Sequence, residues 1–390
     1  MRIWLLAENW PPRVGGIERY LTGIVGHLDG HEITVFAPTP SRSPSYEEEK
    51  STRVIRKRFF WPMWPKWLPL YFSLKKQATT EKPDIIFCGK ALVEGRIALL
   101  LKKTHGIPYI VCTYGMEIAT WSNTPRIRMQ LEKVLHHASA VLYINDQTKQ
   151  ELLELGASEK RLHPLYPGID AQKLSHMNNP DEVLARYKIQ EPYILSVCRL
   201  VKRKGTSDLI EAFAKITVIP APEPESTSTW IPGQARDDNP RLVVVGDGPE
   251  KNRLEKQAKK LHCKALFLGQ IPDEDLHALY SRATAFALTP KELPGDYEGF
   301  GIVYLEAAFF ELPVIATKTG GVAGAVIDRI TGILTEPGNI QSIQDALQKI
   351  LSQPTLAKQY GQTGKERVMN EFLWDTIINR LEIIIQNIHI

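Results

Sequence analysis

The chain has 390 residues and a mass of 44.1 kDa, which predicts two substantial domains at about 150 residues each. Hydrophobic residues make up 43% and charged residues 24%, so the chain can bury a large core and is not disordered overall. The 48 basic and 44 acidic residues give a net charge of +4, too small to indicate nucleic acid as the main partner. Four scattered cysteines and the lack of a long apolar run predict a cytoplasmic protein without disulfides.

Short apolar runs alternate with amphipathic stretches through the first half of the chain. Strands are predicted at 3–7, 33–37, 83–88, 108–112 and 140–144, with helices between them, such as 17–28 and 95–103. This alternation predicts a parallel sheet with helices on both faces. The polar stretch 171–183 that follows is expected to be a hinge and not a packed element.

Basic residues precede aromatic ones in the segment 53–76, which contains Trp61, Trp64 and Trp67. This composition suits a peripheral contact with a membrane interface. An ordinary strand and helix joined by a Pro-rich loop accounts for the same residues. Both interpretations of the segment stay open at this point.

A second series of strands occupies 193–197, 241–245, 265–268, 283–288, 313–317 and 332–334, again alternating with helices. The Pro-rich stretch 217–240 interrupts one short connection and is expected to be an exposed insertion without a catalytic role. The C-terminal region is mostly helical, and its apolar end is expected to cross back onto the first domain. The predicted domains are therefore 1–175 together with 368–390, and 176–367.

Candidate ligand-binding residues follow the ends of predicted strands. Gly15 and Gly16 open the first helix, where backbone N–H groups without a Cβ in the way can approach a phosphate or a sugar. Arg199 and Lys204 follow the strand 193–197, at the carboxyl end where parallel sheets bind ligands. An Arg fork and a Lys at this place can clamp a diphosphate.

Two glutamates, Glu298 and Glu306, flank a Gly-Phe-Gly turn that opens a helix. At 100° per residue, side chains eight residues apart on one helix point about 80° apart, so we assign Glu298 to the loop and Glu306 to the helix. Glu298 can then reach sugar hydroxyls, and Glu306 can reach the vicinal hydroxyls of a ribose. The N–H groups of residues 300–303 can hold a phosphate at the helix N-terminus.

Six segments carry a resemblance to a known family, in that family's order: PPRVGGIERY, SVCRLVKRKG, RLVVVGDGPE, FLGQIPDEDLHALYSRA, EGFGIVYLEA and LPVIATKTGGVAGAVIDRITGIL. The chain resembles the retaining, nucleotide-sugar-dependent glycosyltransferases of the GT-B fold. More closely, it resembles the large bacterial family 4, group 1, which includes phosphatidylinositol mannosyltransferases and relatives of sucrose and glycogen synthases. The resemblance implies an α/β protein with two Rossmann-like domains facing a cleft, and a C-terminal helix that crosses back to the first domain.

The resemblance also implies roles for individual residues. Arg199 and Lys204 bind the donor pyrophosphate, Glu298 the donor sugar and Glu306 the ribose; the first three are the implied catalytic residues. The implied donor-binding set is Gly15, Gly16, Arg199, Lys204, Gly248, Ile271, Glu298, Gly299, Phe300, Gly301, Ile302, Val303 and Glu306. Tyr114 and Glu117 are expected on the acceptor or sugar side, with Tyr114 standing where the family usually has a histidine.

The function implied is transfer of a hexose, with retention, from a UDP- or GDP-sugar to a lipid-linked or glycan acceptor. Its setting would be lipopolysaccharide, other envelope polysaccharide or glycolipid synthesis at the cytoplasmic face of the inner membrane, with possible contact through 53–76. No metal or other cofactor is expected, because the Asp-x-Asp of Asp273 and Asp275 begins a helix as a charged first turn. A catalytically impaired nucleotide-sugar-binding protein and a nucleotide-sugar epimerase on the same fold remain alternatives. Two departures from the family pattern, Gly324 and Glu311, are expected to reflect drift or packing.

Overall fold

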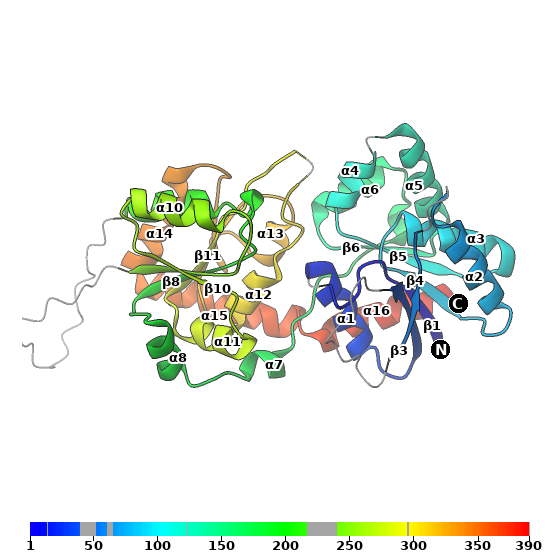
Figure 1. The fold of residues 1–390 in the computed structure, drawn as a ribbon, viewed down its shortest axis with the longest axis horizontal. Helices are drawn as coiled ribbons and strands as arrows, with labels where there is room; N and C mark the ends of the chain where they lie inside the picture. Colours follow the sequence, from blue (N-terminus) through cyan, green and yellow to red (C-terminus); the bar gives the residue numbers. More distant parts are fainter. Residues whose placement is uncertain are drawn as a thin grey trace, which may run out of the picture. The chain divides into compact units, whose positions relative to one another are not determined.

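The protein is described by a computed structural model that covers residues 1–13, 15–39, 52–60, 65–122, 124–216, 240–294 and 296–389 (Figure 1). The chain divides into two compact units, Met1–Gly168 with Trp374–Ile390, and Ile169–Leu373. The divisions lie at 168/169 and 373/374, whereas the sequence analysis placed them at 175/176 and 367/368. At this point the Ile169 N–H donates a hydrogen bond of 2.8 Å to the Phe372 carbonyl. The predicted insertion 217–240, apart from Pro240, and residues 61–64 of the aromatic segment lie outside the described residues.

The first unit is built on a parallel sheet which, in the described part of the chain, has seven strands in the order β3-β2-β1-β4-β5-β6-β7. β4 and β5 are buried at every residue, as expected at the centre of a sheet covered on both faces. Of the two edge strands, the sequence analysis gave β3 only as one of two interpretations of 53–76 and did not predict β7. The strands are β1 (Arg2–Leu6), β2 (Glu32–Pro38), β3 (Arg53–Lys57), β4 (Ile85–Cys88), β5 (Tyr109–Thr113), β6 (Ala140–Tyr143) and β7 (Leu162–Pro164).

The helices of the first unit include the C-terminal helix, as the resemblance implied. Trp374, the first residue of that helix, stacks on His27 with ring centroids 5.4 Å apart. Its indole also lies where a Cβ on Gly23 or Gly168 would be, so both glycines are needed for this packing. The helices are α1 (Gly16–His27), α2 (Leu68–Ala78), α3 (Val93–His105), α4 (Met116–Ser122), α5 (Pro125–His137), α6 (Asp146–Glu154) and α16 (Trp374–His389).

The second unit contains a parallel sheet with the order β10-β9-β8-β11-β12-β13, six strands among the residues described. Chain order runs outward from β8 to one edge and from β11 to the other, so the order reverses between β8 and β11. Ligands bind at such a reversal in open α/β sheets. The strands are β8 (Tyr193–Val197), β9 (Arg241–Val245), β10 (Ala265–Gly269), β11 (Ala285–Leu288), β12 (Val314–Thr317) and β13 (Gly332–Thr335).

Helices cover both faces of this second sheet, with α10 and α14 on one side and α8 and α11 on the other (Figure 1). The unit therefore has three layers, and the loops that follow the carboxyl ends of the strands are not covered by these helices. The helices are α7 (Ala171–Ser175), α8 (Pro180–Tyr187), α9 (Thr206–Ala214), α10 (Lys251–Lys260), α11 (Asp273–Arg282), α12 (Ile302–Phe309), α13 (Val322–Ala325), α14 (Ile340–Ser352) and α15 (Pro354–Glu371).

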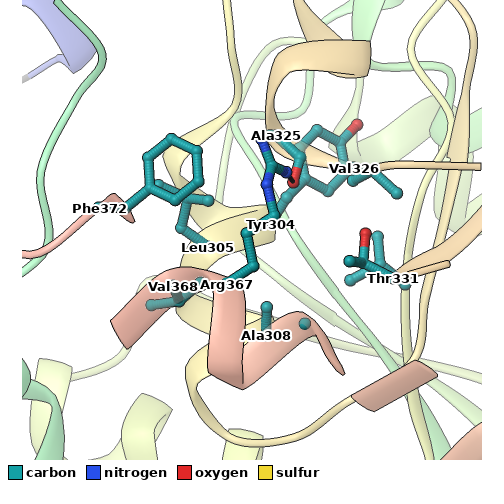
Figure 2. Close-up of a pocket in the computed structure, with 11 residues that line it drawn as sticks. Tyr304, Leu305, Ala308, Ala325, Val326, Thr331, Arg367, Val368 and Phe372 are labelled. Carbon is teal, nitrogen blue, oxygen red and sulfur yellow. Dashed lines mark hydrogen bonds between the residues drawn. The ribbon is translucent and has the colours of Figure 1, made fainter. Parts of the chain in front are cut away.

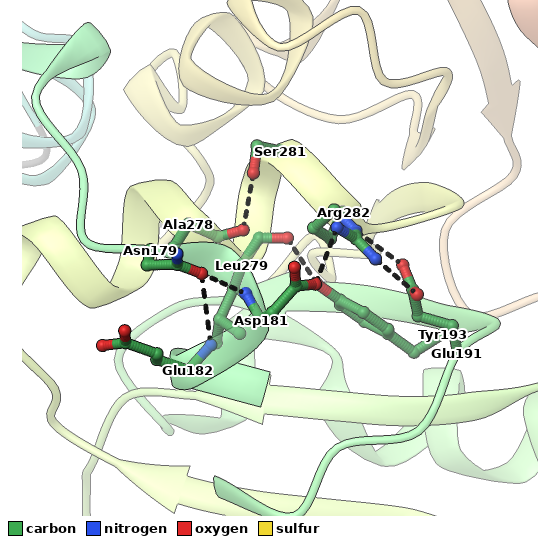
Figure 3. A network of polar contacts seen from close by, with 9 residues as sticks. All are labelled: Asn179, Asp181, Glu182, Glu191, Tyr193, Ala278, Leu279, Ser281 and Arg282. Atoms are coloured by element: carbon green, nitrogen blue, oxygen red, sulfur yellow. Dashed lines mark hydrogen bonds and ion pairs between the residues drawn. The ribbon is translucent and has the colours of Figure 1, made fainter. Parts of the chain in front are cut away.

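The hinge predicted at 171–183 is wrong, because this polar stretch forms α7 and the start of α8 and packs on α11. The side chain of Asn179 caps α8 by accepting a hydrogen bond of 3.0 Å from the Asp181 N–H (Figure 3). Arg282 of α11 then pairs with Asp181 at 3.0 Å and with Glu191 at 3.0 Å. These helices are held largely by polar side chains. Their sequence therefore shows little of the apolar periodicity from which a packed helix is predicted.

The basic and aromatic segment 53–76 forms the ordinary strand β3 and helix α2 where it is described, which is the second of the two interpretations. Leu70 and Leu74 of α2 enter the core, while Phe72 is 58% exposed and Phe60, ahead of the helix, is 41% exposed. Within the described part of the chain, no helix is both long enough and apolar enough to cross a membrane. The contact with a membrane surface therefore stays a prediction.

Candidate functional site

The candidate site of the second unit lies at the carboxyl ends of β8 and β11, where the strand order reverses. The loop after β8 carries Arg199, Arg203 and Lys204, and the loop after β11 carries Asp296 and Glu298. Because β8 and β11 are adjacent and parallel, both loops leave the same edge of the sheet. The two loops, more than ninety residues apart in sequence, thus bring two cations, Arg203 and Lys204, to two carboxylates.

Backbone contacts fix the two loops to each other. The loop after β8 makes a short 3-10 turn, Lys202–Lys204, which ends at Gly205 with φ of 66°. A Cβ on Gly205 would overlap the carbonyl oxygen of Thr289 in the neighbouring loop, so only glycine fits. The Lys291 N–H also donates a hydrogen bond of 2.7 Å to the Arg203 carbonyl. The position of Lys204 is therefore set by main chain on both sides.

A buried ion-pair cluster surrounds Glu298, whose exposed fraction is 7%. Lys204 Nζ contacts its Oε2 atom, and Arg203 Nη1 lies 3.0 Å from the same oxygen. Arg203 Nε also lies 3.1 Å from Asp296 Oδ1. Burial alone would raise the pKa of Glu298, but the charges and hydrogen bonds of Lys204 and Arg203 outweigh it and lower the pKa. Glu298 is thus an anion at neutral pH.

Arg199, the other predicted clamp residue, does not join this cluster. Its side chain is exposed and forms no ion pair with any residue of the described part of the chain. The residue after it is fixed, since the Leu200 N–H donates to the Asp247 carbonyl at 2.9 Å and the Leu200 carbonyl accepts from Glu250 N–H at 3.1 Å. Arg203, which the sequence analysis did not select, lies beside Glu298 instead. The predicted role of Arg199 at the donor diphosphate stays a prediction.

The predicted residues Gly248 and Ile271 belong to the neighbouring strand ends. Gly248 follows β9, and a Cβ there would overlap the backbone of Leu200, so the loops after β8 and β9 are in close contact. Ile271 follows β10 and is half-buried. The Gly246 N–H donates a hydrogen bond of 2.7 Å to the Gly269 carbonyl and joins the loops after β9 and β10. Loops from three adjacent strands therefore line one edge of the sheet.

Helix α12 begins at Ile302, shortly after Glu298, and the remaining residues predicted to bind the donor lie in its first turns or just before it. Gly301 caps it with φ of 86°, and Gly299, Ile302 and Val303 surround the first turn. Phe300 is buried, with its ring centroid 5.9 Å from that of Phe372, so its side chain is part of the core and only its backbone can face a ligand. The N-terminus of the helix and its partial positive charge lie beside the ion-pair cluster.

Glu306 lies one turn into α12 and is half-buried. The hydroxyl of Tyr280 donates a hydrogen bond of 3.2 Å to its Oε2 atom. Tyr280 is completely buried and stacks on Phe310 with ring planes 2° apart, so this donor is rigidly held. The sequence analysis did not select Tyr280, whose apolar helical spacing indicates only a core position.

A small cavity lies under α12, but it does not belong to the candidate ligand site (Figure 2). Its volume is about 10 Å³, which is room for roughly one water and not for a sugar. Arg367 beside it donates to the carbonyls of Gly324 and Ala325 at 2.8 and 3.0 Å. At the departure Gly324 itself, a Cβ would lie 3.1 Å from Phe300 Cε2, a tight contact that the glycine avoids. Glu311, the other departure, pairs with Lys365 at 2.9 Å.

The Asp-x-Asp sequence is structural at its second aspartate. Asp275 is completely buried and accepts hydrogen bonds from Asn178 at 2.7 Å, Arg186 at 2.9 Å and Tyr187 at 2.7 Å. These contacts connect α8 and the segment before it to α11. The described residues contain no cluster of three or more His, Cys, Asp or Glu side chains arranged to hold a metal ion.

In the first unit, Gly15 and Gly16 lie at the N-terminus of α1, as predicted. The carboxylate of Glu18 turns back to this N-terminus, where it would meet a Cβ on Gly15. Glu18 is 7% exposed and accepts a hydrogen bond of 2.7 Å from Asn9 Nδ2, which fixes the loop between β1 and α1. Glu18 is a further residue of this loop that the sequence analysis did not single out.

Tyr114 and Glu117 follow β5 in the first unit and contact each other. Glu117 Oε1 accepts a hydrogen bond of 2.6 Å from the Tyr114 N–H, and burial raises the pKa of Glu117 to about 7. The Tyr114 ring is buried and packs edge-on against Tyr20 at 5.7 Å. Burial also raises the pKa of Tyr114, so its hydroxyl is a hydrogen-bond donor and not a base near neutral pH.

A second perturbed carboxyl, Glu94, lies at the ends of β1 and β4 in the same unit. It is completely buried, and its Oε1 accepts a hydrogen bond of 3.0 Å from the Glu8 N–H. Burial, assisted by the nearby charge of Glu8, raises the pKa of Glu94 to about 7. Lys90 Nζ lies 3.8 Å from Glu8 Oε2 and only partly offsets this effect. Glu94 looked like an ordinary first-turn helix residue in the sequence.

Replacing Glu94 by Gln is expected to make the first unit more stable at high pH. Because the folded pKa of about 7 lies above the unfolded one, the wild type loses stability as pH rises between about 4.5 and 7. The loss, once complete above pH 7, is about 3 kcal/mol, and Gln does not incur it. Denaturant unfolding at pH 5 and pH 8 measures the difference. The same change at the exposed Glu154 is the control and should leave the pH dependence unchanged. If wild type and Glu94→Gln lost equal stability between pH 5 and pH 8, the raised pKa of Glu94 would be contradicted.

Comparison with known proteins adds family and fold information. A family model described as "Glycosyl transferases group 1" matches residues 185–367, which include Arg199, Lys204, Glu298 and Glu306. A second model, "Glycosyltransferase Family 4", matches residues 14–173, which include Gly15, Gly16, Tyr114 and Glu117. The two models together match most of each unit.

One curated relative and two solved structures illustrate the similarity. A GDP-mannose-dependent monoacylated alpha-(1-6)-phosphatidylinositol monomannoside mannosyltransferase of Corynebacterium glutamicum is 27% identical over 396 residues, covering 98% of this chain and 97% of the relative. A sucrose-phosphate synthase from Thermosynechococcus elongatus superimposes with a TM-score of 0.77 at 21% identity, covering 100% and 99% of the two chains. Anabaena HepE, solved with UDP and glucose, gives a TM-score of 0.75 at 19% identity, covering 99% and 100%. The two structures show that the fold is shared.

Proposed function

Because this chain belongs to the family 4, group 1 glycosyltransferases of the GT-B fold, we propose that it transfers a hexose from a UDP- or GDP-sugar, with retention. The acceptor we propose is a lipid-linked sugar or a growing glycan of the cell envelope. The observation that carries the proposal is the cluster of Lys204, Arg203 and Glu298 at the strand-order reversal of the second unit. It combines cations for a diphosphate with a buried carboxylate for sugar hydroxyls.

Transfer of the sugar requires stabilisation of the negative charge that develops on the leaving nucleoside diphosphate. The bond that breaks joins the anomeric carbon of the sugar to a phosphate oxygen, and negative charge grows on the departing diphosphate. Lys204 and Arg199 neutralise that charge, assisted by the N-terminus of α12. The acceptor hydroxyl adds on the same face of the sugar, and its proton passes to the departing phosphate oxygen. In this proposal Glu298 holds the donor sugar by its hydroxyls, and Glu306, oriented by Tyr280, holds the ribose.

A lipid-linked acceptor is supported by the surface around β3 and α2. The exposed Phe60 and Phe72 lie in a segment that also carries Arg58, Lys75 and Lys76. Basic charge beside exposed aromatic rings suits the interface of an anionic membrane. The Corynebacterium glutamicum relative is named for a phosphatidylinositol acceptor, which agrees with this choice. We therefore propose peripheral contact through 53–76 and acceptor binding by the first unit.

A screen of purified protein against UDP-, GDP- and ADP-sugars, with and without EDTA, tests the proposal. Thermal stabilisation by one donor that persists in EDTA, followed by nucleotide release when a membrane-lipid extract is added, is expected for a metal-independent transferase. Stabilisation without any release would favour the alternative of a catalytically impaired nucleotide-sugar-binding protein. Conversion of the donor to its epimer would favour an epimerase, and no response to any donor would overturn the proposal.

A further inference from the structure

Arg203 contacts two carboxylates of the loop after β11. Its Nη1 atom lies 3.0 Å from Glu298 Oε2, and its Nε atom lies 3.1 Å from Asp296 Oδ1. The Arg203 carbonyl is held by the Lys291 N–H at 2.7 Å. One guanidinium therefore bridges two positions of that loop while its own main chain is fixed to the same loop.

Lys204 and Arg203 bind the same oxygen of Glu298, its Oε2 atom. Neither cation engages Oε1, which leaves that oxygen for a sugar hydroxyl. The two cations are not equivalent in chemistry, because a guanidinium fork is planar and held in orientation by two acceptors, whereas an ammonium is a point charge on a flexible stem. Of the two, Lys204 is the one able to turn toward another anion without breaking a second contact.

We propose that Arg203 is a positioning residue, which keeps Glu298 ionised and oriented when Lys204 turns to the donor diphosphate. The inference rests on the proposed function, in which Lys204 binds the diphosphate and Glu298 the donor sugar. A diphosphate competes with Glu298 for the Lys204 ammonium, because both are anions. Glu298 is too buried to lose both of its cations and remain charged.

Asp296 accounts for how Arg203 stays in place during this exchange. When Lys204 turns away, Glu298 keeps one charge-assisted hydrogen bond, from Arg203 Nη1. The Nε atom of the same guanidinium is held by Asp296. Without Arg203, burial would dominate and the pKa of Glu298 would rise, since burial is the largest single influence on it. Glu298 would then take up a proton at mildly acidic pH and lose its fixed orientation toward the sugar.

The test compares the affinity of the donor with that of its own nucleoside diphosphate. The ratio used is the dissociation constant of the nucleoside diphosphate divided by that of the donor. It isolates the contribution of the sugar, and so of Glu298, and it falls when that contribution is lost. In wild type this ratio is expected to stay constant between about pH 5.5 and 8, because Glu298 remains ionised. In Arg203→Met the ratio is expected to be about tenfold lower at pH 5.5 than at pH 8, because Glu298 takes up a proton at the lower pH. Affinity for the nucleoside diphosphate alone should also weaken at pH 8, because Lys204 can then turn to the diphosphate only by leaving Glu298 without a cation.

Two further variants separate orientation from charge. Arg203→Lys retains a charge but not the fork, so it should lower the ratio at every pH without adding a pH dependence. Lys202→Met removes an exposed charge from the same short turn and should behave like wild type. A wild-type pH profile in Arg203→Met, or a wild-type ratio in Arg203→Lys, would overturn the inference while leaving the proposed function in place. No nucleotide binding by wild type would overturn both.

Discussion

Replacing Lys204 by Met is expected to weaken binding of the nucleoside diphosphate about 30- to 100-fold, and to lower transfer by about 10³-fold. The lost charge-assisted hydrogen bond accounts for the first effect. The larger loss in rate follows because the leaving diphosphate carries more charge in the transition state than in the bound donor. Isothermal titration with the diphosphate and initial rates of nucleotide release measure the two effects.

Lys202→Met is the matched control, since it removes an exposed lysine two residues away in the same turn. It is expected to change binding by less than about threefold, the effect of an exposed charge on a nearby anion. The Lys204 variant should remain folded, because Glu298 keeps Arg203 as a partner. Equal losses in the two variants would show that only the net charge of the turn matters and would contradict a specific role for Lys204.

Replacing Gly205 by Ala is expected to destabilise the second unit by several kcal/mol, beyond the cost of the backbone conformation. Gly205 has φ of 66°, and its Cβ would overlap the Thr289 carbonyl, so the loops after β8 and β11 must separate. The separation would also displace Lys204 from Glu298. Denaturant unfolding gives the loss of stability, and hydrogen exchange of the amides in β8, β11 and α9 localises it.

Gly106 offers a matched control for this substitution. It caps α3 of the first unit with the same φ of 66°, but a Cβ there would meet nothing within 4 Å. Ala at position 106 should therefore show the conformational cost alone, about 1 kcal/mol. If the variants at Gly205 and Gly106 lost equal stability, the contact with Thr289 would not matter, contrary to the packing described above.

The strands at the centre of each sheet could be predicted from the sequence because their burial is continuous. β4 and β5 are apolar at nearly every position, and a short apolar run of this kind is typical of a strand covered on both faces. The edge strand β7 is only three residues long and ends in a proline, which gives no periodic signal. The helices at 171–187 were missed for a related reason, since polar contacts such as that between Asn178 and Asp275 hold them.

The candidate site was predictable in location but not in detail. Glu298 and Lys204 follow strands in the pattern of a diphosphate site, and the structure brings them into contact. The pairing of Arg203 with Glu298 could not be predicted, because Arg203 lies in an irregular loop whose sequence does not show which way its side chain turns. Likewise, nothing local distinguishes Glu94 from an exposed first-turn glutamate, since the N–H that it binds belongs to Glu8, 86 positions earlier in the chain.

A crystal structure of the protein with the donor selected by the screen, grown in EDTA, tests the central claim most directly. The account predicts the diphosphate within hydrogen-bond distance of Lys204 Nζ and Arg199, with the sugar hydroxyls against Glu298 Oε1 and the ribose against Glu306. Arg203 should still contact Glu298 Oε2. A nucleotide bound away from the carboxyl ends of β8 and β11, or a diphosphate without contact to Lys204, would contradict it.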